Sequence, residues 1–405
     1  MLVAAATSAC SPSLPAIARA AITNGADDDA DPGVVALLQG STLVCTATLI
    51  APRLLLTAAH CVSGDAMPDA YFGSVPGDGG PRVAIAAVRR HPAFDAATLH
   101  DDVAMALLAE AAPAGATPWP TPATPIAAGA SLRLVGFGRT AAGDTSAPRK
   151  RAGTTTVATV SADELTFAPS PSQTCEGDSG GPAFATLEGV EAIVGVTSSG
   201  DAACTTLARD MRVDVFADTF VAPWVAATAD GAAGAGDRCW YAENCAAGAG
   251  ECAAALDDAT LSFCAPPCDG GCPGGLACLA DSDGRRLCRH SPPSPGAAGA
   301  RCGDDGDCNG THCVARTSGE PTVCAQSCFT DLPGFCGGEL ECAAIAGGNG
   351  AAACFAKPRG GCAFAGATDG DAGALVAIAA LLIALARRRR APRLAISQVR
   401  QYVTW

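Results

Sequence analysis

The chain has 405 residues and a formal net charge of −14, an acidic balance that argues against nucleic-acid binding. Its length predicts two or three domains. Aromatic residues make up only 5% of the chain, so its 49% hydrophobic fraction overstates its capacity to build a core. The 22 cysteines predict an oxidising compartment and therefore export.

Residues 1–21 are predicted to be a leader, or part of a signal peptide with a propeptide. The first nine residues are apolar but short, and no basic residue precedes them. Cys10 follows a faint lipoprotein-type cleavage box, so lipidation at this cysteine and an unstructured leader remain equal alternatives.

Short runs of β-branched residues and leucine follow, separated by Gly, Pro and Asp. Short strands with turn signals between them indicate an all-β barrel or sandwich. Further on, apolar residues at helical spacing from Met211 to Trp224 predict a C-terminal helix with a core role. The predicted strands are Val34–Leu38, Leu43–Ile50, Arg53–Thr57, Val83–Val88, Val103–Leu107, Leu132–Phe137, Thr154–Val160 and Ala192–Thr197.

Three motifs carry candidate catalytic residues. Ser179 lies in the segment EGDSGG, whose glycines permit a tight turn and leave backbone N–H groups to face an oxyanion. His60 ends an apolar run in TAAHC, and Asp102 precedes another apolar run. A hydroxyl, an imidazole and a carboxylate are the groups of an activated nucleophile. Asp101 is the alternative acid, but the apolar run begins directly after Asp102.

The order His60, Asp102, Ser179, with the residues around each, resembles the trypsin/chymotrypsin family of serine proteases over roughly residues 22–228. The resemblance implies two packed six-stranded β-barrels with the site between them. It also implies Ser179 as nucleophile, His60 as general base and Asp102 as the acid that orients the histidine. The N–H groups of Gly177 and Ser179 would form the oxyanion hole. This chemistry requires no cofactor and no metal.

The same resemblance implies an activation step. A family chain that begins Ile-x-x-Gly is freed by cleavage, and its new ammonium pairs with the aspartate before the nucleophile. Ile22 and Asp178 match these positions. Ala21 stands where the family usually has arginine or lysine, so a trypsin-like activator is not expected to cut there.

Resemblance also assigns the substrate pocket to Gln173, Ser198 and Gly200. A neutral Gln173 at the base argues against strict Arg/Lys specificity, although Asp210 could supply a negative charge from the far wall. Ser198 would also support the buried aspartate. The family pattern implies two disulfides, Cys45–Cys61 and Cys175–Cys204.

Sixteen cysteines form two groups of eight at a period of 63 residues. They predict a linker at 229–238, a first module at 239–288, a Pro-rich linker at 289–301 and a second module at 302–354. Even counts predict four disulfides per module, with the connectivity open. Such small modules depend on bridges in place of a core. They would act as a stalk or bind a partner or glycan.

Residues 355–405 are predicted to be a sorting signal. Cys362 precedes the uncharged run Ala372–Ala386, which is shorter than the about 20 residues of a stable span, and an arginine run follows. The arrangement resembles the MYXO-CTERM sorting domain of myxobacteria. That resemblance implies cleavage near Cys362, lipid on that cysteine, and attachment by sorting machinery to the surface of a Gram-negative bacterium. A plain membrane anchor is the alternative.

The sequence therefore predicts an exported, surface-attached, monomeric serine endopeptidase that acts on proteins or peptides. One alternative is a catalytically inactive, protease-like adhesion or binding protein. The other is an esterase that uses the same three residues.

Overall fold

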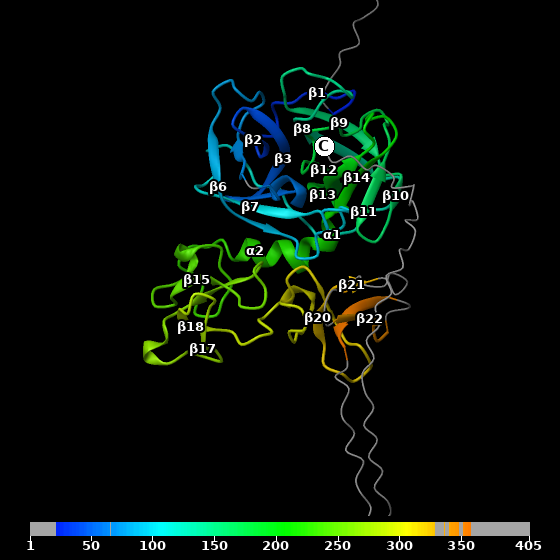
Figure 1. Ribbon diagram of the computed structural model, residues 1–405. Coiled ribbons are helices and arrows are strands. Elements are labelled where there is room, and N and C mark those ends of the chain that lie inside the picture. Colours follow the sequence, from blue (N-terminus) through cyan, green and yellow to red (C-terminus); the bar gives the residue numbers. More distant parts are fainter. Residues whose placement is uncertain (1–21, 65, 329–335, 337–339, 348–350, 358–405) are drawn as a thin grey trace, which may run out of the picture.

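The computed structural model describes residues 22–64, 66–328, 336, 340–347 and 351–357 (Figure 1). The predicted short helix at 372–386, together with Cys10 and Cys362, lies outside these residues. Within the described ranges, no helix is long and apolar enough to cross a membrane.

Six antiparallel strands close into a barrel, drawn in blue and cyan in Figure 1. Strands β2 (Val34–Gln39), β4 (Leu54–Thr57) and β7 (Ala104–Leu108) are rich in aliphatic residues and almost fully buried, because the closed barrel covers their apolar side chains. A 3-10 turn, η1 (Ala59–Val62), follows β4 and carries His60. The barrel order is β2 (Val34–Gln39), β3 (Thr42–Ala51), β4 (Leu54–Thr57), β7 (Ala104–Leu108), β6 (Arg82–Arg90) and β5 (Asp69–Tyr71).

A second antiparallel sheet packs beside the barrel (Figure 1). The all-β class is confirmed, and two-residue strands extend the six longer strands of this sheet. The single strand predicted at Thr154–Val160 is wrong, because the backbone of Val157 turns away to pair with Gly129 and Ala130. The sheet order is β1 (Ala26–Asp27), β9 (Arg151–Thr156), β8 (Ser131–Gly136), β12 (Pro182–Leu187), β13 (Val190–Gly200), β14 (Ala208–Arg212), β11 (Glu164–Phe167) and β10 (Thr159–Val160).

The predicted C-terminal helix is present but begins at Val213, not Met211. Its three parts are α1 (Val213–Phe216), the π-turn η2 (Ala217–Val221) and α2 (Ala222–Ala226). Met211 still belongs to β14, where it pairs with Val196. Below this helix lie the cysteine-rich modules (Figure 1).

The described residues of the modules contain four β-hairpins, and in each hairpin two cysteines lie directly opposite each other. The prediction of four disulfides per module is confirmed. In each run of four cysteines the first bonds the third and the second bonds the fourth, so each module holds two such units. The hairpins are β15 (Glu251–Ala254) with β16 (Ser262–Ala265), β17 (Ala277–Ala280) with β18 (Arg286–Arg289), β19 (His312–Val314) with β20 (Val323–Ala325), and β22 (Leu340–Ala344) with β23 (Ala352–Ala356).

Smaller elements complete the modules: η3 (Ala242–Asn244), η4 (Cys268–Gly270), η5 (Asp305–Asp307) and β21 (Ser327–Cys328). The eight bridges are Cys239–Cys252, Cys245–Cys264, Cys268–Cys278, Cys272–Cys288, Cys302–Cys313, Cys308–Cys324, Cys328–Cys342 and Cys336–Cys354.

The first module packs against the β-domains instead of extending from them as a stalk. Trp240 donates its indole N–H to the backbone oxygen of Trp224 at 2.8 Å, and the two ring systems lie 5.0 Å apart. The guanidinium of Arg89 lies 4.7 Å and 5.0 Å from the centroids of these rings. Arg53 also donates to the hydroxyl of Tyr241 at 2.6 Å. The apolar core therefore continues from the barrel into the module.

Candidate active site

His60 and Asp102 meet at the edge of the barrel. Asp102 is fully buried and accepts a hydrogen bond from His60 Nδ1 at 2.7 Å and from the His60 backbone N–H at 2.9 Å. Ser198, near the end of β13 in the second sheet, donates its hydroxyl to Asp102 Oδ2 at 2.7 Å. This is the oxygen that also accepts from His60 Nδ1. The carboxylate thus fixes the imidazole ring and requires the proton on Nδ1. That leaves Nε2 as the basic nitrogen.

The structure brings Asp102, and not Asp101, to His60. Asp101 has a φ of +52°, which turns its side chain away, and its Oδ1 lies 3.9 Å from the Nδ1 of His91. Burial, with a further contribution from the negative charge of Asp163, raises the pKa of Asp101 to about 6. Asp101 therefore has no direct contact with the candidate general base.

Ser179 lies in a turn that is pressed against the strands leading to His60. Its backbone oxygen accepts a hydrogen bond from the N–H of Thr46 at 2.8 Å, and its side chain is buried. At the next residue, Gly180, a Cβ would collide with Thr57 Oγ1 and lie 2.9 Å from the backbone nitrogen of Ala58. Only glycine fits there, which places Ser179 next to the segment that carries His60.

Asp178 directly precedes Ser179, and its side chain is enclosed by the surrounding protein. It is fully buried, and it accepts hydrogen bonds from the backbone N–H groups of Gly138 at 2.7 Å and Cys175 at 2.8 Å. Burial raises the pKa of Asp178 to about 7, against the opposing effect of bonds from Cys175, Gly138 and Ile22. Ile22 is itself fully buried. The structure thus brings Ile22 and Asp178 together.

The predicted pocket residues are also buried. Gln173 donates its amide to Asp201 at 3.1 Å and to the backbone oxygen of Leu207 at 3.2 Å, so its side chain is held against the segment between β13 and β14. Asp210 is fully buried, and Thr197 lies directly opposite it on β13. With no exposed surface, Asp210 does not offer a substrate the negative charge considered from the sequence. Gly200 ends β13 and is also buried.

A groove of about 410 Å³ opens beside Gly177. Its walls come from both β-domains, with Thr42 and Leu43 on one side and Phe137 and Arg139 on the other. Such a groove next to the candidate oxyanion site can accept an extended chain.

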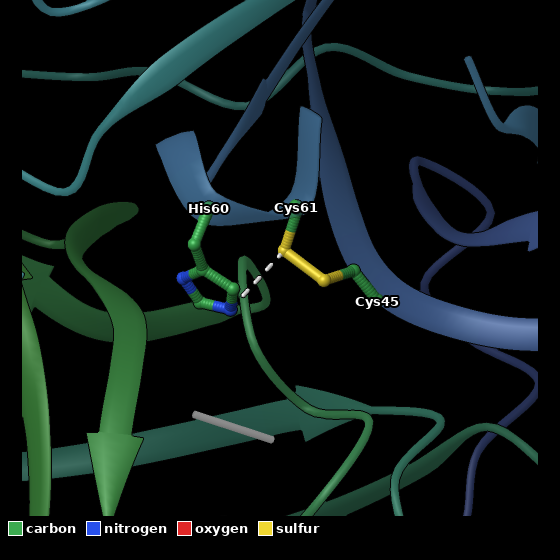
Figure 2. Close-up of side chains that lie close together, drawn as sticks. All are labelled: Cys45, His60 and Cys61. Atoms are coloured by element: carbon green, nitrogen blue, oxygen red, sulfur yellow. Dashed lines mark hydrogen bonds between the residues drawn. A yellow bond between two sulfur atoms is a disulfide. The ribbon is translucent and has the colours of Figure 1, made fainter. Parts of the chain in front are cut away.

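The histidine turn is braced by a disulfide. Figure 2 shows the His60 ring beside the Cys45–Cys61 bridge, with 3.7 Å between Cys61 Sγ and His60 Nε2. These three residues have metal-ligand types, but both sulfurs belong to a disulfide and neither is the thiolate that zinc binds. The second bridge, Cys175–Cys204, joins the Ser179 turn to the segment between β13 and β14.

Sequence reasoning missed the role of Thr46. Its hydroxyl donates to the backbone oxygen of Gly177 at 2.9 Å and accepts from the backbone N–H of Phe137 at 3.2 Å. Together with its backbone bond to Ser179, these contacts lock the candidate oxyanion turn. In the sequence, only its position directly after Cys45 marks it.

Part of the chain is similar in sequence to known proteins. A family model described as Trypsin matches residues 22–225, just over half of the chain. "Serine protease SP24D" of Anopheles gambiae is 33% identical over 171 residues, which are 38% of this chain and 62% of that protein. The chain therefore spans less than two thirds of that relative.

Two solved structures are also similar: human heparin binding protein, at 19% identity, and a mutant of it, at 18%. For each the TM-score is 0.44, with 49% of this chain and 94% of the other covered. On the evidence of the family model, the chain belongs to the trypsin family of serine proteases.

Proposed function

We propose that this chain is an exported serine endopeptidase that cleaves peptide bonds in proteins or peptides. The observation that carries the proposal is the buried Asp102, which holds His60 by two hydrogen bonds beside the Ser179 turn. A buried carboxylate that accepts a hydrogen bond from Nδ1 keeps the imidazole in the tautomer whose Nε2 can act as a general base.

In the proposed reaction, the Ser179 hydroxyl attacks the peptide carbonyl carbon while His60 Nε2 takes its proton. The N–H groups of Gly177 and Ser179 stabilise the oxyanion of the tetrahedral intermediate. His60 then gives the proton to the leaving amine, and an acyl-enzyme remains. Water, deprotonated by His60, hydrolyses that ester and releases the acid. Asp102 stabilises the imidazolium formed in each half-reaction, and Ser198 holds Asp102 in place.

Export and surface attachment are part of the proposal. Ten disulfides among the described residues support folding in an oxidising compartment. The tail with Cys362 would attach the protein to the cell surface. Since Gln173 is neutral and Asp210 is shielded, the proposed specificity is not strictly for arginine or lysine.

The direct test is covalent labelling of the full chain with a fluorophosphonate, which reacts with activated serines. Labelling is expected in the unmodified protein and in Ser63→Ala, a control three residues from His60, and is expected to vanish in Ser179→Ala. A folded, processed chain that takes no label would favour the inactive binding-protein alternative. Labelling with ester turnover but no cleavage in a peptide library would favour the esterase.

A second prediction concerns activation at Ile22. Replacing residues 18–21 by the recognition sequence of a site-specific protease lets Ile22 be freed on demand. Because burial holds the pKa of Asp178 near 7, a new ammonium at Ile22 is expected to pair with its carboxylate and order the oxyanion turn. We expect kcat/KM for a peptide to rise about 10²–10³-fold on cleavage, the value of one oxyanion donor.

The matched control carries a scrambled recognition sequence and receives the same protease treatment. Equal activity of the cleaved and uncleaved chains would show that the Ile22–Asp178 contact has no role in activation.

A further inference from the structure

The loop that leads to Asp102, residues 91–103, is closed on itself by backbone hydrogen bonds. His91, directly after β6, donates its N–H to the oxygen of Val103 at 2.9 Å. Between these ends, Leu99 donates to Asp95 at 2.7 Å and Asp95 donates to the oxygen of His100 at 3.2 Å. His91 is therefore bonded to the residue that follows Asp102.

The His91 side chain is held by packing and by few polar contacts. It is 4% exposed and lies edge-on between the rings of Phe216 and Phe220, each at 5.1 Å between centroids. Its Nδ1 accepts from the N–H of Ala93 at 3.4 Å, and Asp101 lies 3.9 Å from the same nitrogen. Burial lowers the pKa of His91 to about 3, against a smaller effect of the Gly310 backbone. The ring is thus neutral, and the shape of its surroundings fixes its position.

The second cysteine-rich module supplies the remaining wall of this site. Gly310, with a φ of +69°, donates its N–H to the backbone oxygen of Thr219 in η2 at 2.9 Å. A Cβ at position 310 would collide with His91 Nε2 and would lie 2.6 Å from His91 Cδ2 and 3.1 Å from Pro92 Cδ. Gly310 therefore packs directly against the His91 ring, and the site has no room for a larger side chain.

Asn309 links the segment that contains Gly310 to the C-terminal helix. Its side-chain oxygen accepts from the indole N–H of Trp224 at 3.1 Å, and its amide donates to the Thr260 hydroxyl of the first module at 2.9 Å. The preceding residue, Cys308, is bridged to Cys324, so this corner of the module is cross-linked. The contact joins the helix and both modules at one point.

We propose that Asn309 and Gly310 are positioning residues for the peptidase reaction: they seat His91 and thereby the loop that carries Asp102. The inference rests on the proposed function, because it assigns the module a part in that reaction. The module then belongs to the catalytic unit in addition to any role at the surface. Displacing His91 would move Val103 and lengthen the 2.7 Å hydrogen bond between His60 and Asp102. Misplacement of about 1 Å can cost about 10²-fold in rate.

The test compares Gly310→Ala with Gly319→Ala in the full, processed chain. Both glycines have a positive φ, +69° and +93°, and both lie in the second module, but nothing lies within 4 Å of a Cβ at 319. Both substitutions therefore carry the strain of a positive φ, and only Gly310→Ala also adds an atom against His91. We expect kcat per fluorophosphonate-titrated site to fall about 10–100-fold in Gly310→Ala, with KM within about twofold. The control should keep its kcat.

A second readout does not depend on turnover. The proton NMR resonance of His60 Nδ1–H reports its hydrogen bond to Asp102, and it should shift in Gly310→Ala and not in Gly319→Ala. If Gly310→Ala does not fold, Asn309→Ala decides, because it removes two hydrogen bonds without adding volume and should lower kcat in the same direction. The positioning role is overturned if the folded variants share the kcat and the resonance of their control. Absence of label and turnover in the unmodified chain would refute the peptidase itself, while the resonance would still test the positioning.

Discussion

Asp102→Asn is expected to lower kcat for peptide cleavage by about 10⁴-fold, the loss typical of serine protease triads. Asp102 accepts from His60 Nδ1 at 2.7 Å and from Ser198 at 2.7 Å. The His60 backbone N–H donates to Asp102 Oδ1, so an asparagine there keeps its oxygen at that position. Its NH₂ group then takes the place of Oδ2 and faces both His60 Nδ1 and Ser198 Oγ. The imidazole then carries its proton on Nε2 and loses the basic nitrogen that must accept from Ser179. Steady-state kinetics at saturating peptide measure the effect.

The neighbouring carboxylate gives a matched control. Asp101→Asn changes the same chemical group one residue away, on a side chain that does not contact His60. We expect it to leave kcat within about threefold of the parent, since exposed and partly exposed substitutions away from a site have small effects. If Asp101→Asn cost as much as Asp102→Asn, the assignment of the orienting acid would be wrong.

The sequence was sufficient to choose between these two aspartates, because the apolar strand β7 starts shortly after Asp102. Local patterns also predicted most barrel strands, since burial on both faces leaves runs of leucine and valine. The left-handed φ of Asp101 could not be read in this way, because nothing in the residue type requires it. The hydrogen bond between His91 and Val103 closes the same loop, and the residue types do not reveal that pairing either.

Predictions failed where pairing partners come from far along the chain. Met211 fits the helical spacing that runs to Trp224, yet it pairs with Val196 in the sheet, and tertiary pairing overrides the local pattern. In the cysteine-rich region the four disulfides of each module were predicted, but not the pattern of four cysteines that occurs twice within each module. Variable gaps between the cysteines obscured the shorter repeat.

The packing of the modules was beyond sequence reasoning for a different reason. The contacts of Arg89 with Trp224 and Trp240 join three segments through two rings and one cation. Nothing in the spacing of single tryptophans indicates a shared partner. The same holds for Gly310, whose restriction comes from the His91 ring and not from its own loop.

Asp210→Asn is expected to stabilise the protein at neutral pH and to leave its stability near pH 4 unchanged. Asp210 is fully buried on β14, and burial raises its pKa to about 8; its cross-strand neighbour Thr197 offsets this only in part, and the charge of Asp178 adds to it. In the unfolded chain the pKa returns to about 3.9. The folded state therefore holds a proton that the unfolded state loses as pH rises.

The sign follows from that difference. Stability from protonated Asp210 is complete below pH 4 and declines as pH rises towards 8. At about 1.4 kcal/mol per pKa unit, the decline by pH 7 is on the order of 4 kcal/mol. Asparagine has nearly the same shape and no charge, so it removes this loss. His91, whose low pKa destabilises the folded state in acid, acts equally in both proteins.

The measurement is the thermal midpoint at pH 4 and pH 8, in a Ser179→Ala background that prevents self-digestion. Asp201→Asn gives a control of opposite sign. Partial burial raises the pKa of Asp201, but backbone N–H bonds from Thr206, Leu207 and Thr205 outweigh it and hold the pKa well below its usual range. Asp201→Asn should lower the midpoint at pH 8 and have less effect in acid. If Asp210→Asn also lowered the midpoint at pH 8, Asp210 would be ionised and paired in the folded protein, and a cation near Thr197 would have to account for it.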